Sequence, residues 1–206
     1  LAGRRAALLA WAEQKNKYIL EDDYNGELRY VSRTVPALQG KSQEKVIYIG
    51  SFSRLLLPSV RIAYMVLPAE LAERAVSDTR LYNQTSSKIE QLALAEYITG
   101  GCLERHIKRS RKVYRAKAAE ILSAVSSVFG KGASAVLYET SISVSITLNL
   151  PVSEESALRS ASEHGIVVER ISRSENGKTK VSLSFAGIAF EKIRPGIEKL
   201  KEVWRI

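Results

Sequence analysis

Short apolar runs of strand length, led into by a helical pattern, are the feature that most limits the fold of this chain. Residues 17–24, 46–50 and 61–67 are apolar segments of strand length, and turn residues follow the first and last of them. An amphipathic pattern over residues 4–16 precedes the first run and predicts a helix. A helix that leads into short apolar strands predicts an α/β fold for this part of the chain.

The rest of the chain divides into a helical middle and a mixed last third. The middle predicts helices over residues 69–77, 86–98 and 103–128. The last third predicts strands near residues 135–138, 142–148, 166–170 and 180–185, and helices over 153–164 and 190–204. Gly100 and Gly101 break the helical pattern, and the part after them can close its own core as an α+β layer. We therefore expect two domains, residues 1–101 and residues 102–206.

Composition excludes some classes of protein. The chain has 206 residues, and none of its apolar runs approaches the roughly 20 residues needed to span a bilayer, so we expect no membrane contact. Its single cysteine, Cys102, excludes an internal disulfide, so we expect a reducing compartment, the cytoplasm. The chain begins without Met inside a helical pattern, which indicates a segment of a longer protein.

The net charge of +9 admits two interpretations. Basic surfaces attract nucleic acids and anionic ligands, but basic helix faces are often only solvated. The densest cluster, residues 105–117, lies in a helical pattern with apolar anchors and has no zinc-finger spacing, aromatic RNA-binding motif or helix-turn-helix. We favour a solvated helix face.

Asp22 and Tyr24 lie two residues apart at the end of a predicted strand, so their side chains share a face. A carboxylate beside a pyridine nitrogen keeps that nitrogen protonated, and a phenol can hydrogen-bond an oxygen on the same ring. Acidic residues are also common at strand ends. Taken alone, the pair therefore carries no functional assignment.

Ser51, Ser53 and Arg61 form a second group, between two predicted strands. Hydroxyls and a guanidinium fork are natural ligands of a phosphate dianion, and Gly50 before them permits close approach to the backbone. Such residues also occur in ordinary loops. Their order after the Asp-x-Tyr pair is a stronger signal than either group alone.

The order of these groups and the sequence around them resemble a known family. Residues 19–30 (ILEDDYNGELRY), 35–40 (VPALQG) and 46–68 resemble signature segments of the MocR-type regulators of the GntR superfamily. Residues 103–109 (LERHIKR) and 182–186 (SLSFA) resemble two further segments of that family. The resemblance extends over nearly the whole chain and favours this branch over ordinary fold-type I aminotransferases.

The resemblance implies a fold and partners. The fold would be that of a fold-type I aminotransferase dependent on pyridoxal 5′-phosphate (PLP), with residues 1–101 ending the large α/β domain and residues 102–206 forming the small α+β C-terminal domain. In this family the aminotransferase-like domain binds PLP, senses an amino-acid-like or vitamin B6 effector, and forms homodimers. DNA would be bound only through a winged helix-turn-helix domain that this chain does not contain.

The resemblance also implies roles for single residues. Asp22 would pair with the pyridine nitrogen and Tyr24 with the 3′ oxygen, while the phosphate would be held by Ser51, Ser53 and Arg61. Arg170 and Arg173 are candidates for an effector carboxylate, because this fold presents an arginine there and a guanidinium fork suits a carboxylate. For either arginine, an exposed position before the turn at residues 175–177 is an equally consistent explanation.

Arg54 is the departure from the family, which has its Schiff-base lysine at this position. A guanidinium stays charged and is a poor nucleophile, so PLP would bind non-covalently at most. Three explanations remain open: a natural sensor without the covalent bond, an engineered substitution, or a fold kept only for dimerisation.

The leading hypothesis is the effector-sensing domain of a MocR-type transcriptional regulator without transaminase turnover. The alternative is a PLP-dependent aminotransferase, or a mutated or degenerate form of one. His106 and His164 have no metal-ligand spacing, and Cys102 has no histidine partner, so we expect neither a metal site nor a catalytic thiol.

Overall fold

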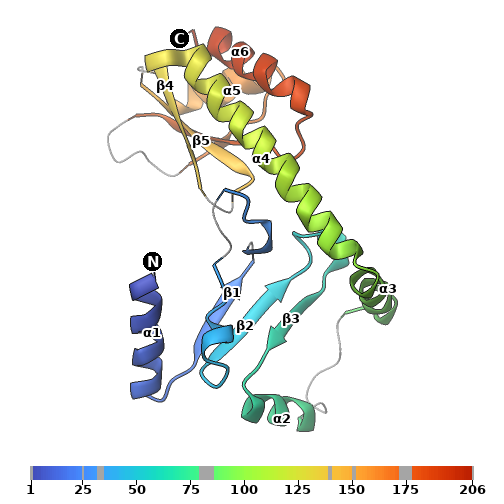
Figure 1. The fold of residues 1–206 in the computed structure, drawn as a ribbon. Helices are drawn as coiled ribbons and strands as arrows, with labels where there is room; N and C mark the ends of the chain where they lie inside the picture. The colour runs from blue at the N-terminus through green and yellow to red at the C-terminus, as the bar shows by residue number, and fades with distance from the viewer. Residues whose placement is uncertain are drawn as a thin grey trace. The chain divides into compact units, whose positions relative to one another are not determined.

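The computed structural model describes residues 2–24, 26–31, 35–78, 86–138, 141–149, 152–171 and 178–205. The chain forms two compact units (Figure 1). The first comprises residues 1–29 and 33–108, and the second comprises residues 30–32 and 109–206. The division falls within helix α4 (Cys102–Phe129), a few residues past Gly100 and Gly101, where the sequence predicts a domain boundary.

The first unit contains a three-stranded sheet in the order β1-β2-β3. Strand β1 (Ile19–Asp23) runs parallel to β2 (Val46–Ser51), and β3 (Ala63–Val66) runs antiparallel to β2. Helices α1 (Ala2–Gln14), α2 (Ala69–Ser77) and α3 (Lys88–Thr99) accompany the sheet. The segments between these elements contain the 3-10 helices η1 (Gly26–Leu28), η2 (Gln39–Lys41) and η3 (Pro58–Val60).

Glu21 of β1 fixes the segment that connects the two parallel strands. Its carboxylate accepts hydrogen bonds from the backbone N–H groups of Leu38 (2.8 Å) and Gln39 (3.1 Å). Arg5 lies 3.5 Å from the same carboxylate and donates to the carbonyl of Pro36 over 2.6 Å. These bonds hold the connection over the sheet, where Leu38 joins a small core with Ala12, Ile19 and Val46.

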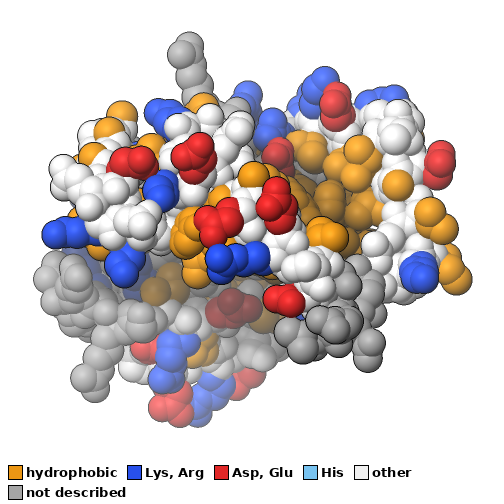
Figure 2. Space-filling model, turned by 90° about the horizontal axis from the view of Figure 1, so that it is seen from below, with side chains coloured by type: hydrophobic (Ala, Val, Ile, Leu, Met, Phe, Trp, Pro, Cys, Tyr) orange, Lys and Arg blue, Asp and Glu red, His pale blue; other side chains and the backbone are white. Residues whose placement is uncertain are grey.

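The first unit leaves large apolar side chains in contact with solvent. β3 is an edge strand whose four residues are all exposed, and α3 exposes 80% of Ile89 and 70% of Leu92. Figure 2 shows apolar side chains grouped on the face seen from below, with charged side chains around them. Apolar surface of this extent is typical of a contact with further protein.

The second unit contains a four-stranded antiparallel sheet in the order β4-β5-β7-β6. The strands are β4 (Ala133–Leu137), β5 (Ser143–Leu148), β6 (Glu169–Arg170) and β7 (Lys180–Ser184). The larger part of α4 packs with α5 (Glu154–Glu163) and α6 (Ile193–Trp204) around the main core. Two short 3-10 helices, η5 (Gly130–Gly132) and η6 (Phe190–Lys192), lie in the connecting segments. Trp204 anchors α6, because its indole N–H donates to the carbonyl of Ala157 over 3.0 Å.

None of the helices in the described part of the chain is both long enough and apolar enough to cross a membrane.

Candidate functional site

The polar residues of the candidate site lie where β1 and β2 end at the same edge of the sheet. The two strands are parallel, with Asp22 opposite Ile49 and Asp23 opposite Gly50. Asp22 and Tyr24 are exposed, and strand alternation places them on the same face as Ser51 at the end of β2. The structure therefore brings the Asp-x-Tyr pair and the first serine of the second group together.

The opposite face of this sheet edge is closed by aromatic side chains. The Tyr48 hydroxyl donates to Asp23 Oδ2 over 3.1 Å, and burial is the main cause that raises the pKa of Tyr48, with the nearby hydroxyl of Tyr64 and the Asp23 carboxylate adding to it. The Tyr64 ring lies 6.0 Å from the Tyr48 ring and 5.2 Å from the Phe52 ring. These contacts join the ends of all three strands.

Gly50 is required by the same packing. A Cβ atom at this position would lie 2.4 Å from Cζ of Tyr64, far inside a van der Waals contact. The sequence predicts that this glycine permits the close approach of a ligand to the backbone. In the structure, the side chain that uses the space is Tyr64.

The segment from Ser51 to Arg61 folds into a compact turn. The Ser51 hydroxyl accepts a hydrogen bond from the backbone N–H of Ser53 over 3.3 Å, and the Phe52 N–H donates to the carbonyl of Ile62 over 3.0 Å. Arg61 ends η3 in the left-handed conformation, with φ 48° and ψ 32°. That conformation costs a non-glycine residue about 1–2 kcal/mol, so its presence indicates that the surrounding turn fixes it.

Arg54 lies in this turn with its side chain partly buried. Its Cζ atom is 5.6 Å from the centroid of the Tyr24 ring, so the cation lies against the phenol. Its Nε atom is buried and has no hydrogen-bond partner among the residues that the structure describes. A buried donor without a partner is costly, which makes this guanidinium a candidate for contact with an anion.

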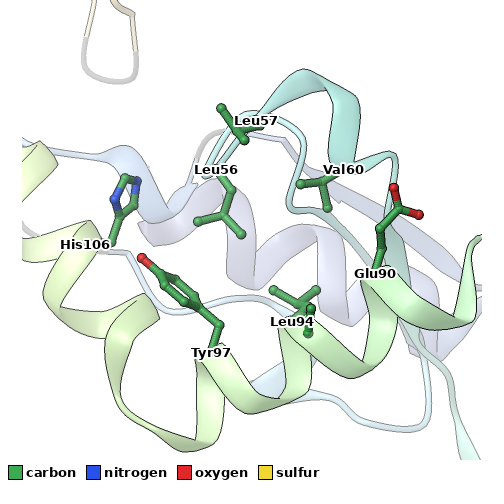
Figure 3. Close-up of a pocket in the computed structure, with 8 residues that line it drawn as sticks. Leu56, Leu57, Val60, Glu90, Leu94, Tyr97 and His106 are labelled. Atoms are coloured by element: carbon green, nitrogen blue, oxygen red, sulfur yellow. The ribbon is translucent and has the colours of Figure 1, made fainter.

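An apolar cavity of about 440 Å³ lies behind the same turn (Figure 3). Leu56, Leu57 and Val60 of the turn form one wall, α3 supplies the opposite wall, and His106 of α4 closes one end. The His106 Nε2 atom is 2.9 Å from the carbonyl oxygen of Leu55. The sequence indicated a packing or surface histidine here, but it gave no sign that this residue holds the Arg54 turn, because the two are 51 positions apart.

Of the two arginines predicted to bind an effector carboxylate, the structure describes one. Arg170 lies in β6 of the second unit, and its Nε atom is 2.5 Å from Glu154 Oε1. A carboxylate ligand would have to compete with Glu154 for this arginine. Arg173 lies outside the described residues. Within the ranges that the structure describes, the His, Cys, Asp and Glu side chains form no cluster that could hold a metal ion.

Comparison with known proteins identifies the chain. No protein-family model matches it. Two HTH-type transcriptional regulators of Bacillus subtilis, YdeL and YhdI, are 43% and 40% identical over 98% of the chain. MocR of Rhizobium meliloti, named a probable rhizopine catabolism regulatory protein, is 41% identical over 53% of the chain. The chain belongs to the MocR-type family.

Several aminotransferases of known structure are similar to this MocR-type domain. LysN, the α-aminoadipate aminotransferase of Thermus thermophilus, matches 100% of the chain with a TM-score of 0.78 and 25% identity. The predicted fold-type I architecture is therefore confirmed. The chain spans about half the length of the relatives it matches, 45% of YdeL and 54% of the LysN chain.

Proposed function

We propose that this MocR-type domain is the effector-sensing part of a transcriptional regulator and that it holds a PLP-like ligand without a covalent bond. The observation that carries the proposal is Arg54, whose buried Nε has no partner among the described residues and whose guanidinium lies against Tyr24. An arginine here offers an anion contact, whereas imine formation needs an amine that can lose its proton.

The other residues of the site fit the chemical groups of PLP. Asp22 would pair with the pyridine nitrogen and Tyr24 with the 3′ oxygen, which agrees with the shared face of the two side chains. Ser51, Ser53 and Arg61 would hold the phosphate, since hydroxyls and a guanidinium suit a dianion. PLP itself supplies an aldehyde and an electron-withdrawing ring when it is bound.

A regulator requires a binding event, and the proposed partners follow from that role. The effector would be an amino-acid-like or vitamin B6 compound, and its carboxylate would meet Arg170 or Arg173. DNA would be contacted through a winged helix-turn-helix domain outside this chain, as the HTH-type relatives suggest. The exposed apolar surface of the first unit supports a homodimer.

The proposal is tested by titrating the full-length protein with PLP and following both binding and absorbance. We expect saturable binding, no covalent adduct after borohydride reduction, and no transfer of amino groups. Arg54→Lys introduces an amine that can condense with the aldehyde and release water, so we expect borohydride to trap an adduct in this variant. Arg74→Lys, in an exposed ion pair of α2, is the matched control and should trap none.

Two results would contradict the proposal. If the folded wild-type protein does not bind PLP, the remaining hypothesis is that the fold is kept only for dimerisation. Amino-group transfer by the wild-type protein would instead establish the aminotransferase alternative.

A further inference from the structure

Arg54 lies beside a residue assigned to the ligand ring. Its Cζ atom lies over the Tyr24 ring, 5.6 Å from the ring centroid. A cation–π contact uses the charge of the guanidinium and not its N–H donors. The Nε–H is buried and has no hydrogen-bond partner among the described residues, so this donor is unsatisfied.

No acidic side chain in the described part of the chain pairs with Arg54. Among the described residues, Arg54 forms no ion pair with Asp or Glu, although two carboxylates lie near the end of the adjacent strand. Asp23 already accepts the hydroxyl of Tyr48 on the other face of the sheet. Asp22 shares the face of Tyr24 and is exposed to solvent. A positive charge of this kind favours an anionic ligand group beside it.

The position of that anionic group follows from the chemistry of a substituted pyridine. If Tyr24 binds the 3′ oxygen of the ring, the two substituents beside that oxygen in PLP are the methyl group and the aldehyde. The aldehyde lies on the side of the phosphate arm. Arg54 lies over Tyr24 and belongs to the same turn as Ser51 and Arg61, which would hold the phosphate, so the aldehyde is the substituent that meets the guanidinium.

We infer that Arg54 makes the site selective for 5′-phosphorylated pyridines that carry a carboxylate in place of the aldehyde. The inference rests on the proposed function, because it assumes that the ring and the phosphate bind as described above. A carboxylate accepts two parallel N–H bonds from a guanidinium, an aldehyde oxygen is a neutral acceptor, and an aminomethyl group carries a positive charge that Arg54 repels.

This difference predicts an order of affinity for three ligands that vary only at one position. The 4-carboxylate analogue of PLP should bind most tightly, PLP next, and pyridoxamine 5′-phosphate least tightly. A charge-assisted hydrogen bond at a partly buried site corresponds to about a tenfold to a hundredfold change in affinity. We therefore expect the carboxylate to bind at least about tenfold more tightly than PLP.

The experiment is isothermal titration of the full-length protein with each of the three ligands. Arg54→Gln removes the charge and should bring the three dissociation constants to within a few-fold of one another. Arg74→Gln removes a positive charge from α2, where Arg74 pairs with Glu70 over 3.0 Å, and should leave the order unchanged. If Arg54→Gln does not fold, the order in the wild-type protein decides the question by itself.

The outcomes separate this inference from the function on which it rests. Equal binding of all three ligands, or tightest binding of pyridoxamine 5′-phosphate, would overturn the selectivity assigned to Arg54 while leaving a PLP-type site in place. Failure of all three to bind the folded protein would overturn both. Tightest binding of the carboxylate in the wild type, lost in Arg54→Gln and kept in Arg74→Gln, would establish the selectivity assigned to Arg54.

Discussion

Replacing Tyr48 with phenylalanine tests the contact that ties together the ends of the two parallel strands. The hydroxyl of Tyr48 donates to Asp23 Oδ2 over 3.1 Å, and Asp23 lies between the two residues assigned to the ligand ring. A hydrogen bond to a charged group contributes about 1.5–3 kcal/mol, and solvent at this half-buried position reduces it to about 1 kcal/mol. We expect Tyr48→Phe to lower the free energy of unfolding of the first unit by that amount at neutral pH.

The same bond makes stability depend on pH in the alkaline range. The pKa of Tyr48 is raised above its ordinary value of 10.0, mainly by burial, so the folded state keeps a proton that the unfolded state releases. The contribution of Tyr48 to the free energy of unfolding is therefore fully present below pH 10 and is lost as the pH rises further. The slope is at most about 1.4 kcal/mol per pH unit, and solvent screening of the half-buried phenol lowers it. Tyr48→Phe lacks this group and should lose stability less steeply.

Urea denaturation between about pH 7 and about pH 11 provides the measurement, because this range brackets the ordinary tyrosine pKa of about 10. The chain has two tryptophans, Trp11 and Trp204, so replacing Trp204 with phenylalanine in both proteins leaves Trp11 as a reporter of the first unit. Other titrating groups are common to both proteins and cancel in the difference. Parallel stability curves for the two proteins across this range would refute the reasoning.

Two further predictions concern each unit separately. Trp204→Ala should destabilise the second unit by about 3–5 kcal/mol in thermal or chemical unfolding, because it empties a buried site and removes a hydrogen bond. Trp11→Ala, at a half-exposed position, is the control and should have a much smaller effect. Equal effects of the two substitutions would contradict the assigned burial. Glu21→Ala should cost the first unit about 2 kcal/mol, because two backbone N–H groups lose their acceptor, and should speed amide exchange there. Glu70→Ala, at an exposed ion pair, is its control, and an effect as large as that of Glu21→Ala would argue against the role of Glu21.

Local pattern was sufficient to predict the strands and most of the helices. The run at residues 46–50 is confirmed as β2, because its side chains pack on both faces of the sheet. The run at residues 61–67 is shortened to Ala63–Val66, since Arg61 adopts the left-handed conformation at the end of η3. The strand predicted over 166–170 is reduced to Glu169–Arg170, which pair only with the edge of β7. Such ends depend on pairing partners that are distant in sequence.

The composition of the candidate site was visible in the sequence, but its internal contacts were not. Spacing of two residues placed Asp22 and Tyr24 on one face, and the strand register brings Ser51 to the same edge. The contact of Arg54 with the Tyr24 ring joins residues 30 positions apart, and no local rule predicts it. The same holds for His106 and Leu55, which only the packing of α4 brings together. The roles of these residues toward a ligand stay predictions.

The exposed edge strand β3 has a practical consequence for anyone who handles this chain in solution. One side of β3 pairs with β2, while its other side has no strand partner among the residues that the structure describes, and Met65 is 60% exposed. Such an edge can pair with the same edge of another molecule, which leads to association and aggregation. We expect the isolated chain to associate as its concentration rises, and a charged replacement such as Met65→Lys to improve its solubility without altering the sheet.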